Sequence, residues 1–244
     1  PDDRMIVLDL FCENKPVWNI TEAFHGKPWL WCMIHSFGNQ VSLHAGLPAI
    51  MDNLDAARTS PDRGKLLGMG YIMEGLGYSP VFYDFSSEQM WQPGKRDLDQ
   101  WIAGYAQRRY GVAVPGAETA WKGLLDTALR APGQTNSAIC ARPALNEKAA
   151  PGTTSPKLAK AFDTLLACSD TLGAHDTYRY DVANTLRQVL VQVADRYHYD
   201  LQQACAKKDR EALKTAGAHL TGLMLDLDML LATRPEFLLG KWVA

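Results

Sequence analysis

The sequence has 244 residues and a hydrophobic content of 47%, which suits a protein with one large or two small domains and a buried core. Its 25 basic and 27 acidic residues give a net charge of -2, and the basic residues are scattered, so we expect no nucleic-acid partner. No apolar run approaches the roughly 18 residues that a membrane-spanning helix needs, so we expect no membrane span.

The cysteines are odd in number and irregularly spaced: Cys12, Cys32, Cys140, Cys168 and Cys205. This spacing is typical neither of a disulfide framework nor of a zinc site. We therefore expect most of them to be free, buried thiols that behave as small hydrophobic side chains.

Before residue 93, short apolar runs are separated by Gly, Pro and Asn. The runs are residues 4–11, 28–35 and 66–74. Runs that are apolar on both faces fit strands of a parallel sheet covered by helices, and the connections are long enough for crossover helices. Residues 47–58 have helical apolar spacing and predict one such helix.

Each of these runs ends in polar residues. Asp9 with Glu13 follows the first run, His35 with Asn39 the second, and Glu74 the third. Because the carboxyl ends of parallel strands face the ligand in α/β folds, this edge of the sheet is the predicted functional site.

After residue 93 the apolar period becomes helical. The predicted helices lie between Asp97 and Gly111 and at residues 118–129, 158–168, 180–205 and 210–231, the last two as an antiparallel pair. Four prolines between residues 131 and 156 predict a long irregular connection there. The chain is therefore expected to be α/β over residues 1–92 and all-α over residues 93–244.

Glu74 is the strongest candidate for chemistry. It closes a glycine-rich strand, and the nearby Gly68, Gly70, Gly75 and Gly77 leave room for a substrate to approach. A helix-capping or ion-paired glutamate would give the same local pattern, so the residues alone leave both interpretations open.

Trp31 and His35 lie on the same face of the second predicted strand, because side chains alternate along a strand. An aromatic ring there suits sugar stacking, although burial in the core is the usual role of tryptophan. Cys32 and His35 point to opposite faces and so cannot share a metal ion. Nucleophile-elbow and phosphate-binding glycine motifs are absent.

Five segments, in this order and spacing, resemble α-N-acetylglucosaminidases, the glycoside hydrolase family 89 that includes the lysosomal enzyme of heparan sulfate breakdown. The segments are residues 7–11, 31–38, 68–75, 106–112 and 237–242. The resemblance covers nearly the whole chain and is weakest between residues 131 and 156.

The resemblance implies the C-terminal strands and helices of a (β/α)₈ barrel in residues 1–92, followed by an incomplete α-helical C-terminal domain in residues 93–244. It also implies a retaining hydrolase that removes terminal α-linked N-acetylglucosamine from glycans with two glutamates and no metal or other cofactor. Glu74 would be the nucleophile, and Trp31 and His35 would contact the sugar.

The family's acid/base glutamate belongs to an earlier strand that is not in this sequence, and neither Glu13 nor Glu88 matches its motif. We therefore expect the 244-residue chain to be inactive alone, and to need the rest of the same polypeptide to complete the barrel. Because members of this family are secreted, periplasmic or lysosomal, the resemblance implies one of these locations for this protein. The remaining alternatives are another α-glycoside-processing enzyme and a non-enzymatic carbohydrate-binding or helical interaction module.

Overall fold

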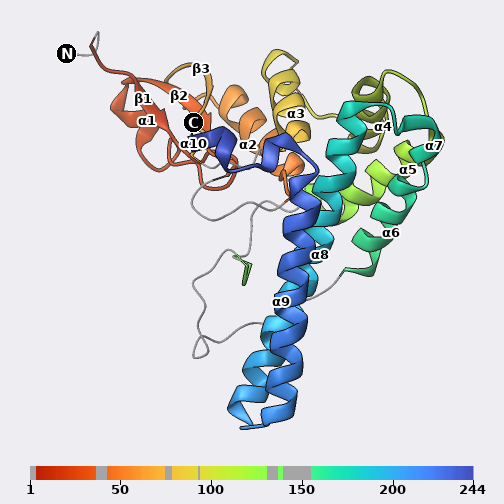
Figure 1. Ribbon diagram of the computed structural model, residues 1–244. Helices are drawn as coiled ribbons and strands as arrows, with labels where there is room; N and C mark the ends of the chain where they lie inside the picture. The colour runs from red at the N-terminus through yellow and green to blue at the C-terminus, as the bar shows by residue number, and fades with distance from the viewer. Residues whose placement is uncertain are drawn as a thin grey trace. The chain divides into compact units, whose positions relative to one another are not determined.

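The computed structural model describes residues 4–36, 43–74, 79–92, 94–130, 137–139 and 155–243 (Figure 1). The chain divides into two compact units. The first comprises Pro1–Trp101 and Ala128–Thr135, and the second Ile102–Thr127 and Asn136–Ala244.

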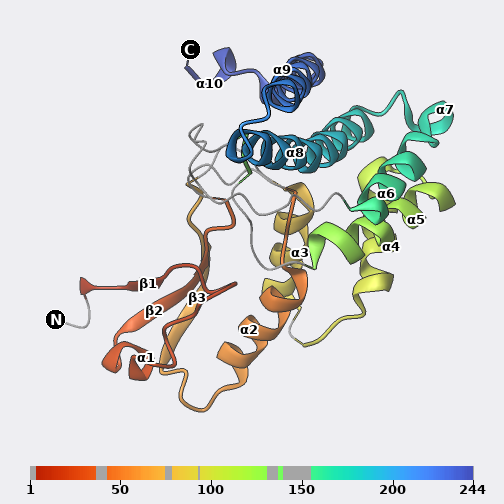
Figure 2. The same ribbon diagram turned by 90° about the horizontal axis from the view of Figure 1, so that it is seen from below.

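The first unit contains a parallel sheet. Among the described residues it has the strand order β1-β2-β3, formed by Val7–Asp9, Pro28–Met33 and Lys65–Tyr71 (Figure 2). The predicted parallel strands are thus confirmed, but all three end earlier than expected. Phe11 and His35 have positive φ values of 67° and 62°, which turn the chain away soon after β1 and β2 and end the pairing there.

Helices α2 (Leu47–Thr59) and α3 (Pro80–Trp91) lie beside each other on one side of this sheet (Figure 2). The prediction of a helix at residues 47–58 is confirmed, and its apolar positions Leu47, Ile50 and Leu54 are buried. Helix α3 was not predicted, because two of its buried positions are the polar Ser86 and Gln89, which weaken its apolar stripe. The short α1 (Glu22–His25) is a left-handed turn with positive φ throughout.

The second unit is helical, and α4 leads into it. Its helices are α4 (Leu98–Tyr110), α5 (Pro115–Leu124) with the π-helical η2 (Leu125–Leu129), α6 (Pro156–Leu166), α7 (Ser169–Leu172), α8 (Asp176–Ala206), α9 (Arg210–Ala232), η3 (Pro235–Phe237) and α10 (Gly240–Val243). The five predicted helices are all present within a few residues of the expected bounds. The two longest, α8 and α9, form the predicted pair (Figure 1).

A buried ion pair fixes α4 against α8. The Arg109 guanidinium donates from Nε and Nη2 to the two carboxylate oxygens of Asp181, at 2.9 and 3.0 Å. The Tyr110 hydroxyl also donates to Asp181 at 3.1 Å and accepts a hydrogen bond from Trp121 Nε1 at 2.9 Å. The bidentate geometry and the extra donor compensate for removing the carboxylate from water.

Cys12, Cys32 and Cys168 are buried free thiols, as expected, and Cys205 is free but only half-buried. Cys140 and most of the predicted irregular connection lie outside the described residues. In the part of the chain that the structure describes, no helix is both long and apolar enough to cross a membrane.

Candidate functional site

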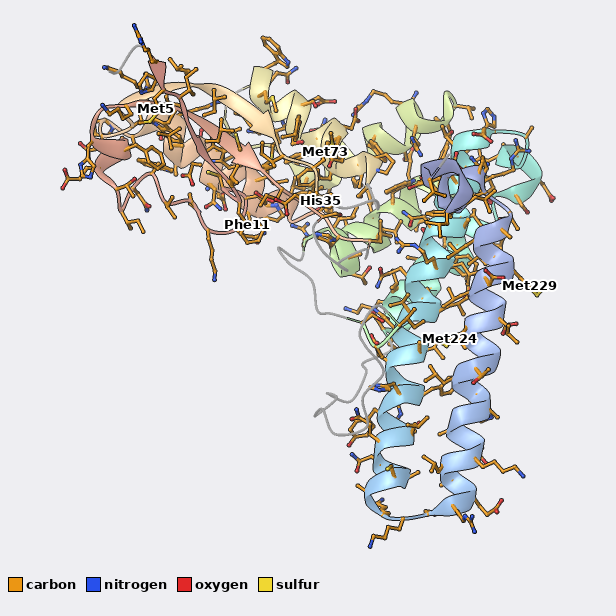
Figure 3. All side chains as sticks on the ribbon, turned by 60° about the vertical axis from the view of Figure 1, so that its left-hand side comes forward. Met5, Phe11, His35, Met73, Met224 and Met229 are labelled. Atoms are coloured by element: carbon orange, nitrogen blue, oxygen red, sulfur yellow. The ribbon has the colours of Figure 1, made fainter. Side chains whose placement is uncertain are left out.

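The three strands end at a common edge of the sheet. Register pairs Met33 of β2 with Tyr71 of β3, and the Ile72 amide donates to the Met33 carbonyl at 2.8 Å. Phe11, His35 and Met73, which follow the three strands, are labelled at this edge in Figure 3, and Met5, which precedes β1, is labelled at the opposite end. Of the polar residues predicted at the carboxyl ends of the strands, the described ones, Asp9, Glu13, His35 and Glu74, therefore end or follow strands at this edge.

Asp9 at this edge has a structural role. Its carboxylate accepts hydrogen bonds from the backbone amides of Val17, at 3.0 Å, and Trp18, at 2.9 Å. The side chain is buried, so these bonds replace its lost hydration and fix the loop after β1.

Glu13 is bound to the end of β2. Its Oε1 accepts hydrogen bonds from the amides of Ile34, at 3.0 Å, and His35, at 2.8 Å. The residue is only 5% exposed, and burial raises the pKa of its carboxyl group while the amide donors oppose that rise. Asn53 Nδ2 donates to the carbonyls of Cys12 and Glu13, which ties this loop to α2.

The His35 ring is packed between aromatic neighbours. It stacks on Phe82 of α3, with ring centroids 3.9 Å apart and planes 13° apart, and lies 4.4 Å from the His44 ring. His44 Nε2 is 3.3 Å from the His35 carbonyl oxygen. Burial, followed by the charge of His44, lowers the pKa of His35 well below its usual value, so the ring is neutral at pH 7.

Helix α3 also contacts the end of β3. The Tyr71 hydroxyl is hydrogen-bonded to Ser86 Oγ at 2.8 Å and Ser87 Oγ at 3.0 Å, and its ring lies 5.2 Å from that of Tyr83. These bonds fix the last residue of β3, three positions before Glu74.

Glu74 differs from the other predicted site residues, Trp31 and His35, in its exposure to solvent. Glu74 is exposed beyond the end of β3, next to Met73, which is 56% exposed. Trp31 is fully buried, and His35 is 4% exposed. Asn39, Gly75 and Gly77 lie outside the described residues.

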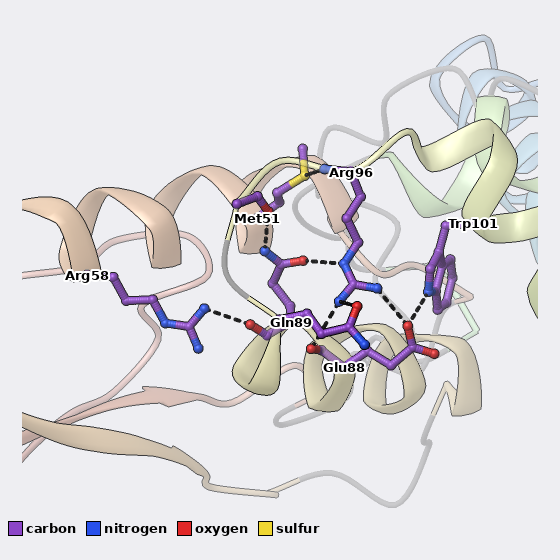
Figure 4. Close-up of polar contacts among 8 residues, drawn as sticks. Met51, Arg58, Glu88, Gln89, Arg96 and Trp101 are labelled. Carbon is purple, nitrogen blue, oxygen red and sulfur yellow. Dashed lines mark hydrogen bonds and ion pairs between the residues drawn. The ribbon is translucent and has the colours of Figure 1, made fainter.

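Glu88, on α3, belongs to a separate polar network (Figure 4). Its Oε2 forms an ion pair with Arg96 Nη1 at 2.7 Å and accepts a hydrogen bond from Trp101 Nε1 at 3.0 Å. Arg96 Nε also donates to Gln89 Oε1 at 3.0 Å. This network holds the chain between α3 and α4 and explains Glu88 as a structural residue.

Sequence reasoning missed the residues that surround His35. Phe82 and Tyr83 come from α3, more than 45 positions along the chain, and His44 follows β2 without any ligand-like spacing. Nothing local in the sequence signals that their rings meet, because the contacts depend on how α3 packs against the strand ends. Among the described residues, no group of three or more His, Cys, Asp or Glu side chains is placed to hold a metal ion.

Comparison with known sequences identifies both parts of the chain. Residues 101–244 match the family described as "Alpha-N-acetylglucosaminidase (NAGLU) C-terminal domain", and residues 1–93 match its "tim-barrel domain". The chain is 32% identical to human alpha-N-acetylglucosaminidase over 250 residues. That alignment covers 100% of this chain and 34% of the human protein, so the chain spans about a third of its curated relative.

Solved structures agree with this. A family 89 glycoside hydrolase from Clostridium perfringens in complex with PUGNAc matches 100% of this chain with a TM-score of 0.85 and 28% identity, over 29% of its own chain. A variant from the same organism with two glutamates replaced by glutamine, in complex with its substrate GlcNAc-alpha-1,4-galactose, matches 98% of this chain with a TM-score of 0.83 and 27% identity, over 28% of its own chain. The chain therefore belongs to the α-N-acetylglucosaminidase family.

Proposed function

We propose that this chain is part of a retaining glycoside hydrolase that removes terminal α-linked N-acetylglucosamine from glycans, with Glu74 as its nucleophile. The observation that carries the proposal is the position of Glu74. It is an exposed carboxylate beyond the carboxyl end of a parallel strand, in a chain that belongs to this family. Residues 1–92 would supply the last part of a (β/α)₈ barrel, and residues 93–244 an incomplete helical domain.

In this mechanism the Glu74 carboxylate attacks the anomeric carbon and forms a covalent glycosyl-enzyme. A second carboxyl group about 5–5.5 Å away protonates the leaving oxygen and then activates the water that releases the sugar. Both displacements invert the anomeric centre, so the product retains the configuration of the substrate.

The second carboxyl group is proposed to come from polypeptide outside this chain. Glu13 is bound to the β2 end and Glu88 to Arg96, so both carboxylates already have structural partners. The substrate complex of the bacterial relative was obtained with two glutamates replaced, which is consistent with a two-glutamate site.

His35 is proposed to hydrogen-bond the sugar, because its ring lies just after β2 at the same sheet edge as Glu74. The residue is 4% exposed, so this contact also requires the side chains that cover the ring to move. Stacking of Trp31 on the sugar stays a prediction. Since the Trp31 ring has no exposed surface, stacking would require the residues that cover it to move.

The rest of the same polypeptide is the proposed partner that completes the barrel. Among the described residues, β1 and β3 each pair with one strand only, and Leu8 on β1 and Leu67 on β3 are 45% and 60% exposed. Unpaired strand edges with apolar side chains are a liability unless further strands cover them. Secretion, or delivery to the periplasm or the lysosome, is proposed from the family alone.

The test uses the full-length polypeptide and an aryl α-N-acetylglucosaminide. Replacing Glu74 with Ala is expected to lower kcat by several orders of magnitude, since it removes the group that forms the covalent intermediate. Because Glu74 is exposed and outside the core, Tm should stay within the range of a neutral surface substitution. Normal turnover by the variant would remove Glu74 from the nucleophile role.

A further inference from the structure

The backbone at the end of β2 has an unusual conformation. The Ser36 amide donates to the Ile34 carbonyl at 2.9 Å, which closes a three-residue turn centred on His35. His35 has φ 62°, so this is the γ-turn with positive φ, which is rare and strained for a residue with a side chain. Such a turn persists only where its surroundings enforce it.

Glu13 is the side chain that enforces this turn. Its Oε1 accepts hydrogen bonds from the amides of Ile34 and His35, two consecutive residues of the turn. The loop that carries Glu13 is fixed in turn, since the Cys12 amide donates to the Cys32 carbonyl at 2.9 Å and Asn53 holds the Glu13 carbonyl. A carboxylate accepting from two amides is a strong, directional restraint.

The turn determines where the His35 ring lies. With the backbone reversed at this residue, the ring stacks on Phe82 at 3.9 Å. An extended backbone would direct the side chain elsewhere, because side-chain direction follows the backbone dihedrals. The register of β2 and β3 then keeps the turn beside the residues that lead to Glu74.

We propose that Glu13 is a positioning residue of the active site, which holds the strained turn at His35 through Oε1 and so fixes the place of the His35 ring at the sheet edge that carries Glu74. The proposal rests on the proposed glycosidase function. Among the described residues, Oε2 of Glu13 is buried without a hydrogen-bond partner. Only one oxygen of the Glu13 carboxylate, Oε1, therefore holds the turn, and the side-chain oxygen of a glutamine can replace it.

The test compares Glu13→Gln and Glu13→Ala in the full-length polypeptide with an aryl α-N-acetylglucosaminide. Glu13→Ala leaves both amides without an acceptor and is expected to lower kcat/KM about 10²-fold, as misplacement of a substrate contact does. Glu13→Gln keeps an acceptor oxygen and is expected to retain kcat/KM within about tenfold, since a neutral acceptor is only weaker than a charged one. Hydrogen exchange of the Ile34 and His35 amides should accelerate in the alanine variant alone.

Glu88→Gln is the matched control, because Glu88 is another partly buried carboxylate of the same unit with structural partners. It should lower Tm and leave kcat/KM of the folded protein unchanged. If Glu13→Ala behaves like this control, with lower Tm and normal kcat/KM, the positioning role is wrong. Failure of Glu13→Gln to restore kcat/KM would also overturn it, because the carboxylate would then act through its charge or its proton.

The Glu74→Ala variant separates this inference from the function on which it rests. Full activity in Glu74→Ala contradicts the proposed nucleophile, whatever the Glu13 variants do. Loss of activity in Glu74→Ala together with normal activity in Glu13→Ala contradicts only the positioning role. If exchange of the two amides is equal in all Glu13 variants, Glu13 does not hold the turn, and the inference fails without any assay of turnover.

Discussion

At the scale of single residues, burial makes His35 a neutral ring. Burial of the ring, followed by the charge of the neighbouring His44, disfavours its protonated form and lowers the pKa of His35 well below the usual value of 6.5. A neutral imidazole can donate from one nitrogen and accept at the other, which suits hydrogen bonding to sugar hydroxyls.

Acidification is therefore expected to destabilise this region. Because the folded pKa of His35 is below the unfolded value, the unfolded chain takes up a proton as pH falls below 6.5 while the folded chain does not. The contribution of His35 to stability is fully present above pH 6.5 and decreases as the pH falls toward the lowered pKa of the folded protein. The His35→Phe variant cannot be protonated at this position, so its Tm should fall less on acidification. The measurement is Tm of both proteins between pH 7 and about 5, with NMR of the His35 ring. A ring that titrates at or above 6.5 would contradict the burial argument.

The sequence predicted which residues gather at the sheet edge, but not what they do there. Glu13 and His35 are 22 positions apart, and their hydrogen bond forms only because β1 and β2 pair in parallel. Asp9 resembled a functional carboxylate by position, yet its two amide partners make it structural. Positive φ at His35 could not be predicted from the sequence, since this backbone conformation is uncommon for all residues other than glycine.

At the scale of elements, the amphipathic helices were the easiest to predict. In α6 the buried Leu158, Ala161 and Leu165 have helical spacing, and Ser155 caps the helix by accepting from the Leu158 amide. By contrast, the π-helical end of α5 has no local signature, and the predicted range of residues 118–129 merged it with the helix before it. Helix α3 was missed because its core face is partly polar.

Close packing of α5 against α6 depends on Gly123. A Cβ atom at this position would lie 2.9 Å from the Cβ of Ala161, closer than side-chain carbons approach. Gly123→Ala is therefore expected to destabilise by about 1–3 kcal/mol through overpacking, although alanine is the better helix former. Thermal unfolding measures this as a lower Tm. Gly222→Ala on α9 is the control, because its Cβ meets nothing within 4 Å, and it should be neutral or stabilising. Equal effects of the two changes would contradict the packing account.

At the scale of the whole molecule, the chain covers about a third of its human relative and is proposed to carry only one of the two carboxylates of a retaining mechanism. We therefore predict that the isolated 244-residue chain does not hydrolyse an aryl α-N-acetylglucosaminide. Circular dichroism should show the helices of the second unit in the same sample, so that inactivity is not due to unfolding. Turnover at the rate of the full-length polypeptide would show that the proton donor lies within this chain.

The most direct test of the central claim is the product that the full-length Glu74→Ala variant forms from an activated aryl α-N-acetylglucosaminide in the presence of azide. If Glu74 is the nucleophile, azide occupies the space left by its carboxylate and attacks the anomeric carbon once. The account predicts that azide restores turnover and gives the β-configured glycosyl azide. An α-configured azide would instead identify Glu74 as the acid/base residue, and activity that is unaffected by the substitution would exclude it from the catalytic pair.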